Sequence, residues 1–167
     1  MDTEEIRQLC SRDGRSGMTD IKSPEERSIN MAAIKGKDTK PEQYIAHELF
    51  IRGYRYRKHV NYIEGHPDLF LRKYNTAVFI HGCFWHRHDG CRYAYTPKTR
   101  VDFWKKKFAD NTKRDQKVQK ALLKDNIKCI IIWECTVKKM MKDKVFHDEM
   151  LEKIEGALNS EKQFNEF

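Results

Sequence analysis

Apolar side chains recur at helical spacing in the first third of the chain. The sequence Ser-Pro-Glu-Glu at residues 23–26 is typical of a helix start, and this pattern ends near Gly36. A second pattern begins at Thr39, where threonine, proline and glutamate stand in the order of a capping box, and it ends at Gly53. One face of this second helix collects the apolar residues Ile45, Ala46, Leu49 and Phe50. The sequence therefore predicts two helices before the first strand.

Short apolar and aromatic runs predict strands in the middle of the chain. Residues 54–60 alternate aromatic or apolar with basic side chains, and residues 68–71 and 76–80 form two further runs. Residues 73–75 provide the turn between the last two. Residues 129–133 are apolar without interruption, which is typical of a strand that is buried on both faces.

Two more helical patterns complete the predicted fold. One covers about residues 101–124 and is rich in lysine, and the other covers roughly residues 144–158. The resulting order, α-β-β-β-α-β-α, predicts an α/β domain over residues 23–167, with a mixed sheet flanked by helices. PD-(D/E)XK nucleases share this order, although order alone is weak support. We expect the polar, glycine-punctuated residues 1–22 to form a flexible tail.

The charge of the chain favours an anionic partner. Lys and Arg number 33 against 25 Asp and Glu, which gives a formal net charge of +8. Nucleic acid is the commonest partner for such a balance, and a basic protein without one is the alternative. No apolar run is long enough to cross a bilayer. The odd number of cysteines, 5, favours a reducing compartment, so we expect a cytoplasmic protein.

Residues 79–91 concentrate metal-binding side chains in what we expect to be a hairpin-like turn. This segment holds three histidines, two cysteines and three large aromatic residues. Zinc requires four ligands, and the end of the buried run at 129–133 offers a third cysteine. A closed Cys3His zinc site of the structural type would comprise Cys83, His88, Cys91 and Cys135.

The alternative is that these cysteines are small buried hydrophobic residues. Polar and charged neighbours argue against this interpretation for Cys83 and Cys91. Its position inside the apolar run favours it for Cys129, and spacing alone leaves Cys135 undecided. Cys10, in the predicted tail, receives no role.

Carboxylates and histidines at strand ends suggest a second, catalytic kind of site. Asp68 begins a predicted strand and could bind Mg²⁺ through oxygen, although a lone aspartate there is more often an ordinary turn residue. His81 ends the next strand, and His86 would reach the same cleft if the loop folds back; either could exchange a proton near neutral pH. Asp115 could orient a histidine, or could be a solvated helix charge.

Other candidates have ordinary structural explanations. Glu42 is accounted for by the capping box at Thr39. Packing in the core is the usual role of large aromatic residues, and it is favoured for Trp104. For Phe84 and Trp85 core packing and exposure are about equally supported.

Several motifs together resemble the very-short-patch repair (Vsr) endonucleases, bacterial enzymes that nick DNA at T:G mismatches. The resemblance covers most of the chain, from about residue 23 to beyond Cys135. The motifs are Asn30-Met31 before Ala33-Ile34, Gly65-His66-Pro67-Asp68, His81-Gly82-Cys83-Phe84-Trp85-His86, Thr99-Arg100 with Phe103-Trp104, Asn111 with Arg114-Asp115, and Trp133-Glu134-Cys135. The block from His81 to His86 is very specific.

This resemblance implies a PD-(D/E)XK-like fold in which Phe79-Ile80-His81 replaces the usual Glu-x-Lys. Mg²⁺ would bind Asp68 and the backbone carbonyl of Ile80. The catalytic set would be Asp68, His81, His86, Asp115 and Glu42, with Asp115 holding His86 and Glu42 in support. The zinc ligands of the family fall on Cys83, His88, Cys91 and Cys135.

The resemblance also implies how DNA would be bound. The DNA-binding set would be Met31, Phe84, Trp85, Trp104 and Asn111, with the aromatic rings and the methionine wedged between base pairs at the mismatch. The lysines on the helix from about residue 101 would contact phosphates, and a solvated helix face is the alternative for part of them. We expect a monomer that nicks one strand beside a T:G mismatch left by 5-methylcytosine deamination, with host repair machinery as a possible partner. The alternatives are a restriction-type enzyme that cuts both strands and a zinc-stabilised DNA-binding module without catalysis.

Overall fold

The computed structural model describes residues 23, 25–26, 29 and 36–167 of the chain, which divides into two units, Met1–Ile34 and Lys35–Phe167. In the first unit, the Glu26 amide donates to Ser23 Oγ at 3.1 Å and the Ser23 amide donates to Glu26 Oε2 at 2.8 Å. This reciprocal cap confirms the predicted helix start. Met31, Cys10 and the predicted tail lie outside the described residues, so those expectations stay predictions.

A five-stranded mixed sheet forms the centre of the second unit. Its strands are β1 (Arg57–Lys58), β2 (Leu69–Leu71), β3 (Thr76–His81), β4 (Lys128–Trp133) and β5 (Phe164–Glu166), in the spatial order β1-β2-β3-β4-β5. The first three are antiparallel neighbours, while β3, β4 and β5 run parallel. The α/β class and the mixed sheet that the sequence predicted are confirmed.

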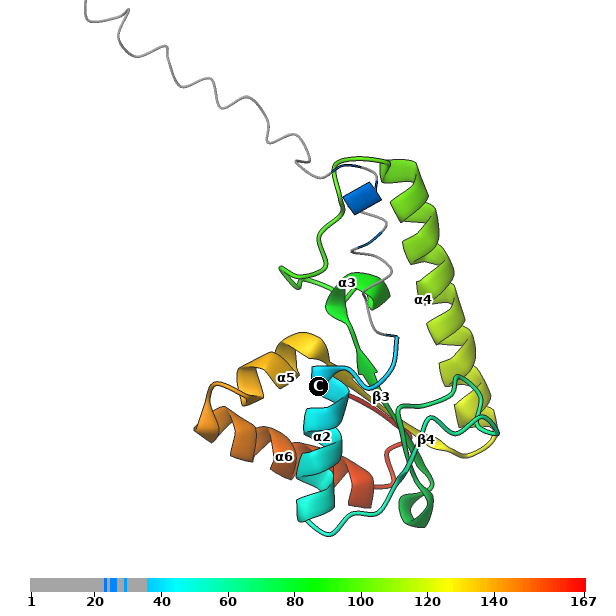
Figure 1. Ribbon diagram of the computed structural model, residues 1–167. Helices are drawn as coiled ribbons and strands as arrows, with labels where there is room; N and C mark the ends of the chain where they lie inside the picture. Colours follow the sequence, from blue (N-terminus) through cyan, green and yellow to red (C-terminus); the bar gives the residue numbers. More distant parts are fainter. Residues whose placement is uncertain (1–22, 24, 27–28, 30–35) are drawn as a thin grey trace, which may run out of the picture. The chain divides into compact units, whose positions relative to one another are not determined.

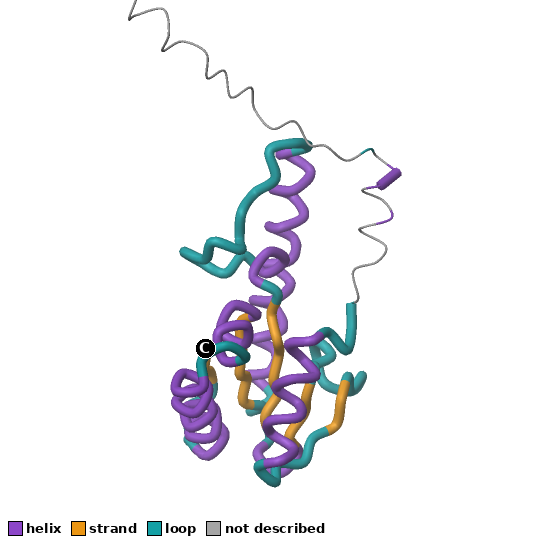
Figure 2. Tube along the Cα trace, turned by 60° about the vertical axis from the view of Figure 1, so that its left-hand side comes forward, coloured by secondary structure: helices purple, strands orange, loops and turns teal. Residues whose placement is uncertain are grey.

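Helices cover both faces of this sheet (Figures 1 and 2). The helical elements of this unit are α2 (Lys40–Ile51), the 3-10 turn η1 (Arg72–Tyr74), α3 (Cys83–His86), α4 (Val101–Lys124), α5 (Glu134–Met140) and α6 (Lys144–Asn159). Side chains alternate along β3, so Val78 and Ile80 join the core shared with α2, α5 and α6. Ala77 and Phe79 join the other core, where α4 contributes Leu122.

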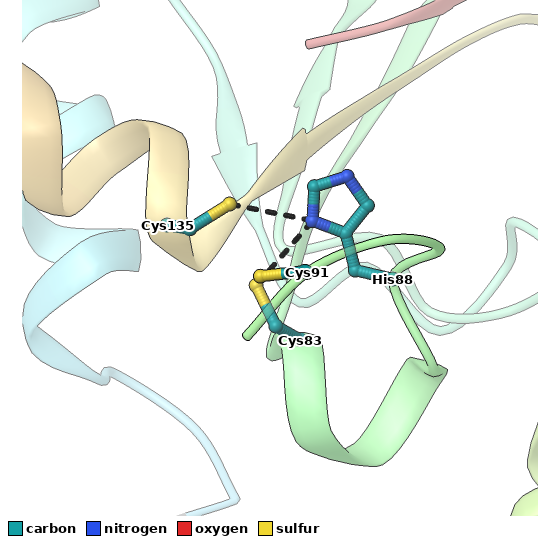
Figure 3. Close-up of side chains that lie close together, drawn as sticks. All are labelled: Cys83, His88, Cys91 and Cys135. Carbon is teal, nitrogen blue, oxygen red and sulfur yellow. Dashed lines mark hydrogen bonds between the residues drawn. The ribbon is translucent and has the colours of Figure 1, made fainter. Parts of the chain in front are cut away.

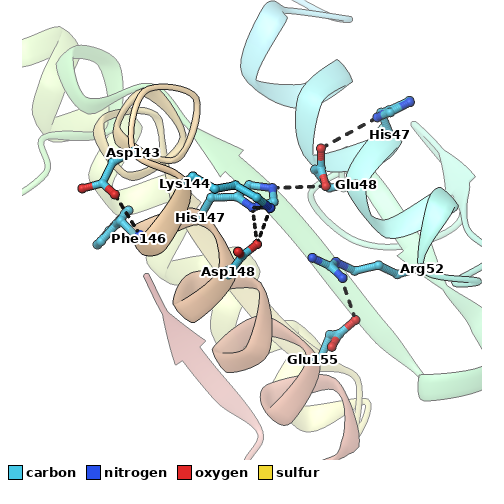
Figure 4. Close-up of polar contacts among 9 residues, drawn as sticks. All are labelled: His47, Glu48, Arg52, Asp143, Lys144, Phe146, His147, Asp148 and Glu155. Carbon is cyan, nitrogen blue, oxygen red and sulfur yellow. Dashed lines mark hydrogen bonds and ion pairs between the residues drawn. The ribbon is translucent and has the colours of Figure 1, made fainter.

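A polar network connects α2 to α6 on the face of the sheet that carries Val78 and Ile80 (Figure 4). The buried His147 ring has Nε2 at 3.2 Å from Glu48 Oε2 and Nδ1 at 2.8 Å from Asp148 Oδ1. Farther along the two helices, Arg52 Nε lies 4.0 Å from Glu155 Oε1. These contacts fix α2, whose first turn carries Glu42.

Several local predictions need correction. Only Arg57–Lys58 of the predicted strand at residues 54–60 pairs with β2, because a left-handed φ of 47° at His59 turns the chain. The expected hairpin-like turn begins instead with the short helix α3. Neither α5 nor β5 was expected. In the part of the chain that the structure describes, no helix is long and apolar enough to cross a membrane.

Candidate active site

Parallel pairing of β3 and β4 brings the chemically important residues to one edge of the sheet. His81 lies opposite Trp133 at the last pair of the ladder. Cys83 and Cys135 each follow two residues later, so equal offsets from one register bring the two cysteines together. Such carboxyl ends of parallel strands are where α/β proteins usually place their binding sites.

Four residues predicted as zinc ligands converge here as a thiol–imidazole cluster, which we define as Cys83, His88, Cys91 and Cys135 (Figure 3). Their donor atoms all lie within 4.8 Å of one another. His88 Nδ1 lies 3.3 Å from the sulfur of Cys135 and 3.7 Å from that of Cys83. The cluster has the composition and closure of a structural zinc site.

The surroundings of the thiol–imidazole cluster hold it in shape. The His88 ring stacks on Trp133, with centroids 4.2 Å apart and planes 4° from parallel. Burial raises the pKa of the Cys83 thiol to about 12, so a bound cation would displace the proton from this sulfur. Cys129 is buried inside β4 among apolar residues, as its position in the sequence indicated.

His81, His86 and Asp115 form a second group, with donor atoms again within 4.8 Å of one another. The two imidazole rings stack with centroids 3.8 Å apart and planes 12° from parallel. His86 Nδ1 lies 2.6 Å from Asp115 Oδ2, which links α3 to α4. Burial, followed by the nearby His86, lowers the pKa of His81 to about 3, so this buried ring is neutral at physiological pH.

Asp68 lies just before β2, and its side chain faces the C-terminal half of β3. The Ile80 amide donates to Asp68 Oδ2 at 2.7 Å. Burial raises the pKa of Asp68 to about 6; the Ile80 hydrogen bond opposes this shift, and the nearby Glu42 carboxylate adds to it. The loop that leads to Asp68 is held close to α4 at Gly65 (φ 83°), where a Cβ would collide with Val118.

Glu42 does not play the capping role that the sequence suggested. Thr39 is the N-cap of α2 but makes no side-chain capping bond, and its hydroxyl donates instead to Glu42 Oε1 at 2.6 Å. Glu42, a residue that is only 7% exposed, lies with Asp68 in a third group that also contains His59. We define Glu42, His59 and Asp68 as the carboxylate cluster.

Sequence reasoning missed His59 altogether. It lies in the run that alternation assigned to a strand, so no local signal marked it as a site residue. Two polar atoms of the carboxylate cluster, Glu42 Oε2 and His59 Nε2, are buried and have no hydrogen-bond partner among the described residues. Two carboxylates with an unpartnered oxygen are a donor set that fits a divalent cation such as Mg²⁺.

Aromatic side chains gather around α3 and the start of α4 as an aromatic cluster, defined as Phe84, Trp85, Tyr95, Trp104 and Phe108. Phe84 is central, with its ring centroid 5.0 to 5.4 Å from those of the other four. Phe84, Trp85 and Trp104 are all half-buried, whereas Tyr95 is 64% exposed. The structure thus brings three predicted DNA-contacting rings together in a partly packed state.

Asn111, the remaining predicted DNA contact in the described part of the chain, is buried. Its side-chain amide donates to the backbone carbonyl of Trp85 at 3.0 Å, which ties α3 to α4. Along the rest of α4, the basic side chains are exposed: Lys105, Lys106, Lys107, Lys113, Arg114, Lys117 and Lys120.

Comparison with known proteins decides the family. A sequence model described as "DNA mismatch endonuclease Vsr" matches residues 19–92. The chain is 46% identical over 121 residues to the type II nicking enzyme V.NmeAIP of Neisseria meningitidis, covering 72% of this chain and 86% of that protein. It is 33% identical over 138 residues to the DNA mismatch endonuclease Vsr of Escherichia coli, covering 83% and 86%. The type II nicking enzyme V.HpaIIP of Haemophilus parainfluenzae is 40% identical over 112 residues, covering 66% and 79%.

The chain belongs to the Vsr family. It is therefore a nuclease of the restriction-endonuclease-like class, as the motifs predicted. The Vsr match at residues 19–92 contains Glu42, Asp68, His81 and His86. Asp115 lies beyond that match, and the structure is what brings it to His86.

Proposed function

We propose that this protein nicks one strand of duplex DNA beside a T:G mismatch, in a reaction that depends on Mg²⁺. The proposal is carried by one observation: the stacked His81–His86 pair and Asp68 converge at the end of β3, next to the aromatic cluster. The names of the Vsr and nicking-enzyme relatives support a one-strand cut.

The two histidines have different tasks in this proposal. His81 is neutral at physiological pH, because burial lowers its pKa to about 3. So weak a base does not hold a proton there, and its ring would instead accept a hydrogen bond that orients the attacking water. His86 directs Nδ1 to the Asp115 carboxylate, which requires that this nitrogen carry the proton and leaves Nε2 to face the phosphate. Asp115 is thus a positioning residue that fixes the tautomer of His86.

Two kinds of metal ion belong to the proposal. Asp68 would hold Mg²⁺ together with the Ile80 carbonyl, and the ion would neutralise charge that develops on the scissile phosphate. Zn²⁺ would occupy the thiol–imidazole cluster and join the loop after β3 to the end of β4, so that its binding contributes to folding.

Mismatch recognition would use the aromatic cluster and the exposed basic residues of α4. Wedging Phe84 and Trp85 between base pairs costs a few kcal/mol of stacking, and less where the pair is already poorly matched. Trp104 and Met31 would support the wedge, Asn111 would hold α3 beneath it, and lysines would fix the phosphates. One active site suffices for one nick, so we infer that the protein acts as a monomer. We also infer that it acts in the cytoplasm.

The test uses closed circular plasmid heteroduplexes that differ only in one T:G or C:G pair. Incubation with Mg²⁺ should open the T:G circle by one nick and leave the C:G circle closed. Asp68→Ala should abolish the nick, while Asp125→Ala, which alters an exposed aspartate at the end of α4, should not. Equal cutting of both plasmids would reject mismatch specificity, and linear product would favour the restriction-type alternative.

A further inference from the structure

His59 lies in the carboxylate cluster although nothing in its local sequence indicates a site. The three members come from three segments: Glu42 lies in the first turn of α2, His59 directly follows β1, and Asp68 directly precedes β2. One donor atom from each lies within 4.8 Å of the others. Ligands of an octahedral cation with bonds of about 2.1 Å lie roughly 3 to 4.2 Å apart, so this spacing is close to that of a formed site.

Two buried polar atoms of the cluster take no part in its hydrogen bonds. Asp68 Oδ2 accepts from the Ile80 amide, and Glu42 Oε1 accepts from the Thr39 hydroxyl. Glu42 Oε2 and His59 Nε2 are buried and have no hydrogen-bond partner among the described residues. Buried polar atoms are nearly always partnered, and two neighbouring carboxylates repel each other, so both features favour a cation bound among these atoms.

The backbone holds His59 in this place. Lys58 pairs with Leu69 across β1 and β2, and the His59 amide donates to the Asp68 carbonyl at 3.3 Å. The left-handed φ of 47° then turns the chain, which ends β1 at this point. The other charged group near the ring is Asp38, whose Oδ1 lies 3.6 Å from His59 Nε2 and 3.1 Å from Lys58 Nζ.

We propose that His59 donates an imidazole nitrogen to the catalytic cation, together with oxygens from Asp68 and Glu42. This inference rests on the proposed function and specifies its metal chemistry. A nitrogen ligand makes the site less suited to the hard, strongly hydrated Mg²⁺ than three oxygens would, and it favours divalent transition metals. The protein therefore binds Mn²⁺ more tightly than Mg²⁺ at this site, and it cuts with either ion.

Mn²⁺ is the appropriate probe because thiolate ligands do not prefer it. The zinc-loaded thiol–imidazole cluster therefore does not compete with the carboxylate cluster for Mn²⁺. Titration of the zinc-loaded, DNA-free protein with Mn²⁺ and Mg²⁺ gives both affinities. His59→Gln should weaken Mn²⁺ binding at least about tenfold and Mg²⁺ binding by less than about threefold. Asp68→Ala should remove both, which shows that the titration reports this site.

Two control variants separate ligation from other roles of His59. Asp38→Asn removes the carboxylate beside the ring, and His47→Gln alters an exposed histidine of α2. His47→Gln should leave the Mn²⁺ affinity within about twofold of the unmodified protein, because His47 lies outside the cluster. Asp38→Asn, which acts only through its contact with the ring, should weaken Mn²⁺ binding less than His59→Gln does. If Asp38→Asn reproduces the effect of His59→Gln, the imidazole serves only to pair with Asp38 and the proposal fails.

A spectroscopic measurement keeps the proposal testable if the His59 variant does not fold. Electron spin echo spectra of Mn²⁺ bound to the unmodified protein should show coupling to a directly bonded nitrogen, and His59→Gln should remove that coupling. Absence of the coupling, or equal weakening of Mn²⁺ and Mg²⁺ binding by the substitution, would overturn the proposal. Because these experiments use no DNA, the metal result stands even if the plasmid assay rejects mismatch nicking, and the converse also holds.

Discussion

The thiol–imidazole cluster and the carboxylate cluster both have donor sets that suit a cation, but they differ in the contacts that their donor atoms already make. In the first, Cys135 and Cys83 approach His88 at 3.3 and 3.7 Å, and the ring rests on an indole. In the second, the donors come from three separate segments, and two buried atoms have no hydrogen-bond partner among the described residues. The first arrangement is suited to a metal site whose ligands all come from the protein. The second is suited to a cation that also binds substrate.

The two clusters also differ in the protonation state of their buried side chains. Burial raises the pKa of Cys83 to about 12 and that of Asp68 to about 6. At physiological pH the Cys83 thiol of the metal-free protein is therefore neutral, whereas most of Asp68 is ionised in spite of its burial. The comparison teaches that the thiol–imidazole cluster can assemble with a protonated Cys83, while the carboxylate cluster carries unfavourable charge that a bound cation would offset.

Breaking the thiol–imidazole cluster should have the largest effect. Cys83→Ser removes one of four ligands, so the protein should lose its zinc and at least about 5 kcal/mol of its free energy of unfolding. Cys129→Ala is the matched control, since it alters a buried strand thiol outside the cluster and should keep the metal. Metal analysis with urea denaturation checks both; a folded, metal-free Cys83→Ser protein of unchanged stability contradicts a zinc role.

Neutralising Asp68 should stabilise the protein and destroy its activity. A carboxyl pKa raised from 3.8 to about 6 costs about 3 kcal/mol above pH 6, a penalty that is absent below pH 3.8. Without added divalent cation, Asp68→Asn should therefore raise the free energy of unfolding by about 3 kcal/mol near pH 8 and by about half as much near pH 5. Urea denaturation at both values measures this difference. A variant that is no more stable near pH 8 contradicts the burial of charge.

The smallest effect should come from Asp115, whose carboxylate is hydrogen-bonded to His86. Asp115→Asn removes the carboxylate that fixes the tautomer, so we expect the nicking rate to fall about 100-fold while DNA affinity and zinc content stay unchanged. Asp110→Asn, an exposed aspartate on the same helix, serves as the control. Single-turnover nicking and a DNA-binding titration separate the two quantities. Equal losses of rate and affinity would mean that Asp115 supports the helix rather than the histidine.

Signals that are local in sequence predicted most of the fold. The helix over 101–124 matches α4, and the predicted helix at 144–158 is one residue short of α6, because apolar spacing and burial coincide there. Strand β5 was missed, since its three residues have no alternation of their own. It is held by parallel pairing with β4 and by the 2.6 Å bond from Trp133 Nε1 to Glu166 Oε1.

The two clusters differ in the same way in how well sequence predicts them. Three of the four thiol–imidazole residues lie within nine positions, and Cys135 follows an obvious strand, so their convergence could be foreseen. The local pattern around Glu42 wrongly indicated a capping residue, and only the family resemblance assigned it to the site, because a capping-box pattern does not show that its carboxylate lies beside Asp68. His59 could not be found, because its position depends on a left-handed residue at the end of a two-residue strand.

The pairing of His81 with Trp133 has a consequence for how the chain folds. Parallel strands can slip along each other, and a slip of one residue moves the partners by about 3.3 Å and reverses which face each side chain points to. Cys83 and Cys135, at equal distances from that pair, meet only when the alignment is correct. A misaligned sheet would keep the four residues of the thiol–imidazole cluster apart, so metal binding at that cluster would stabilise only the correct alignment of β3 with β4.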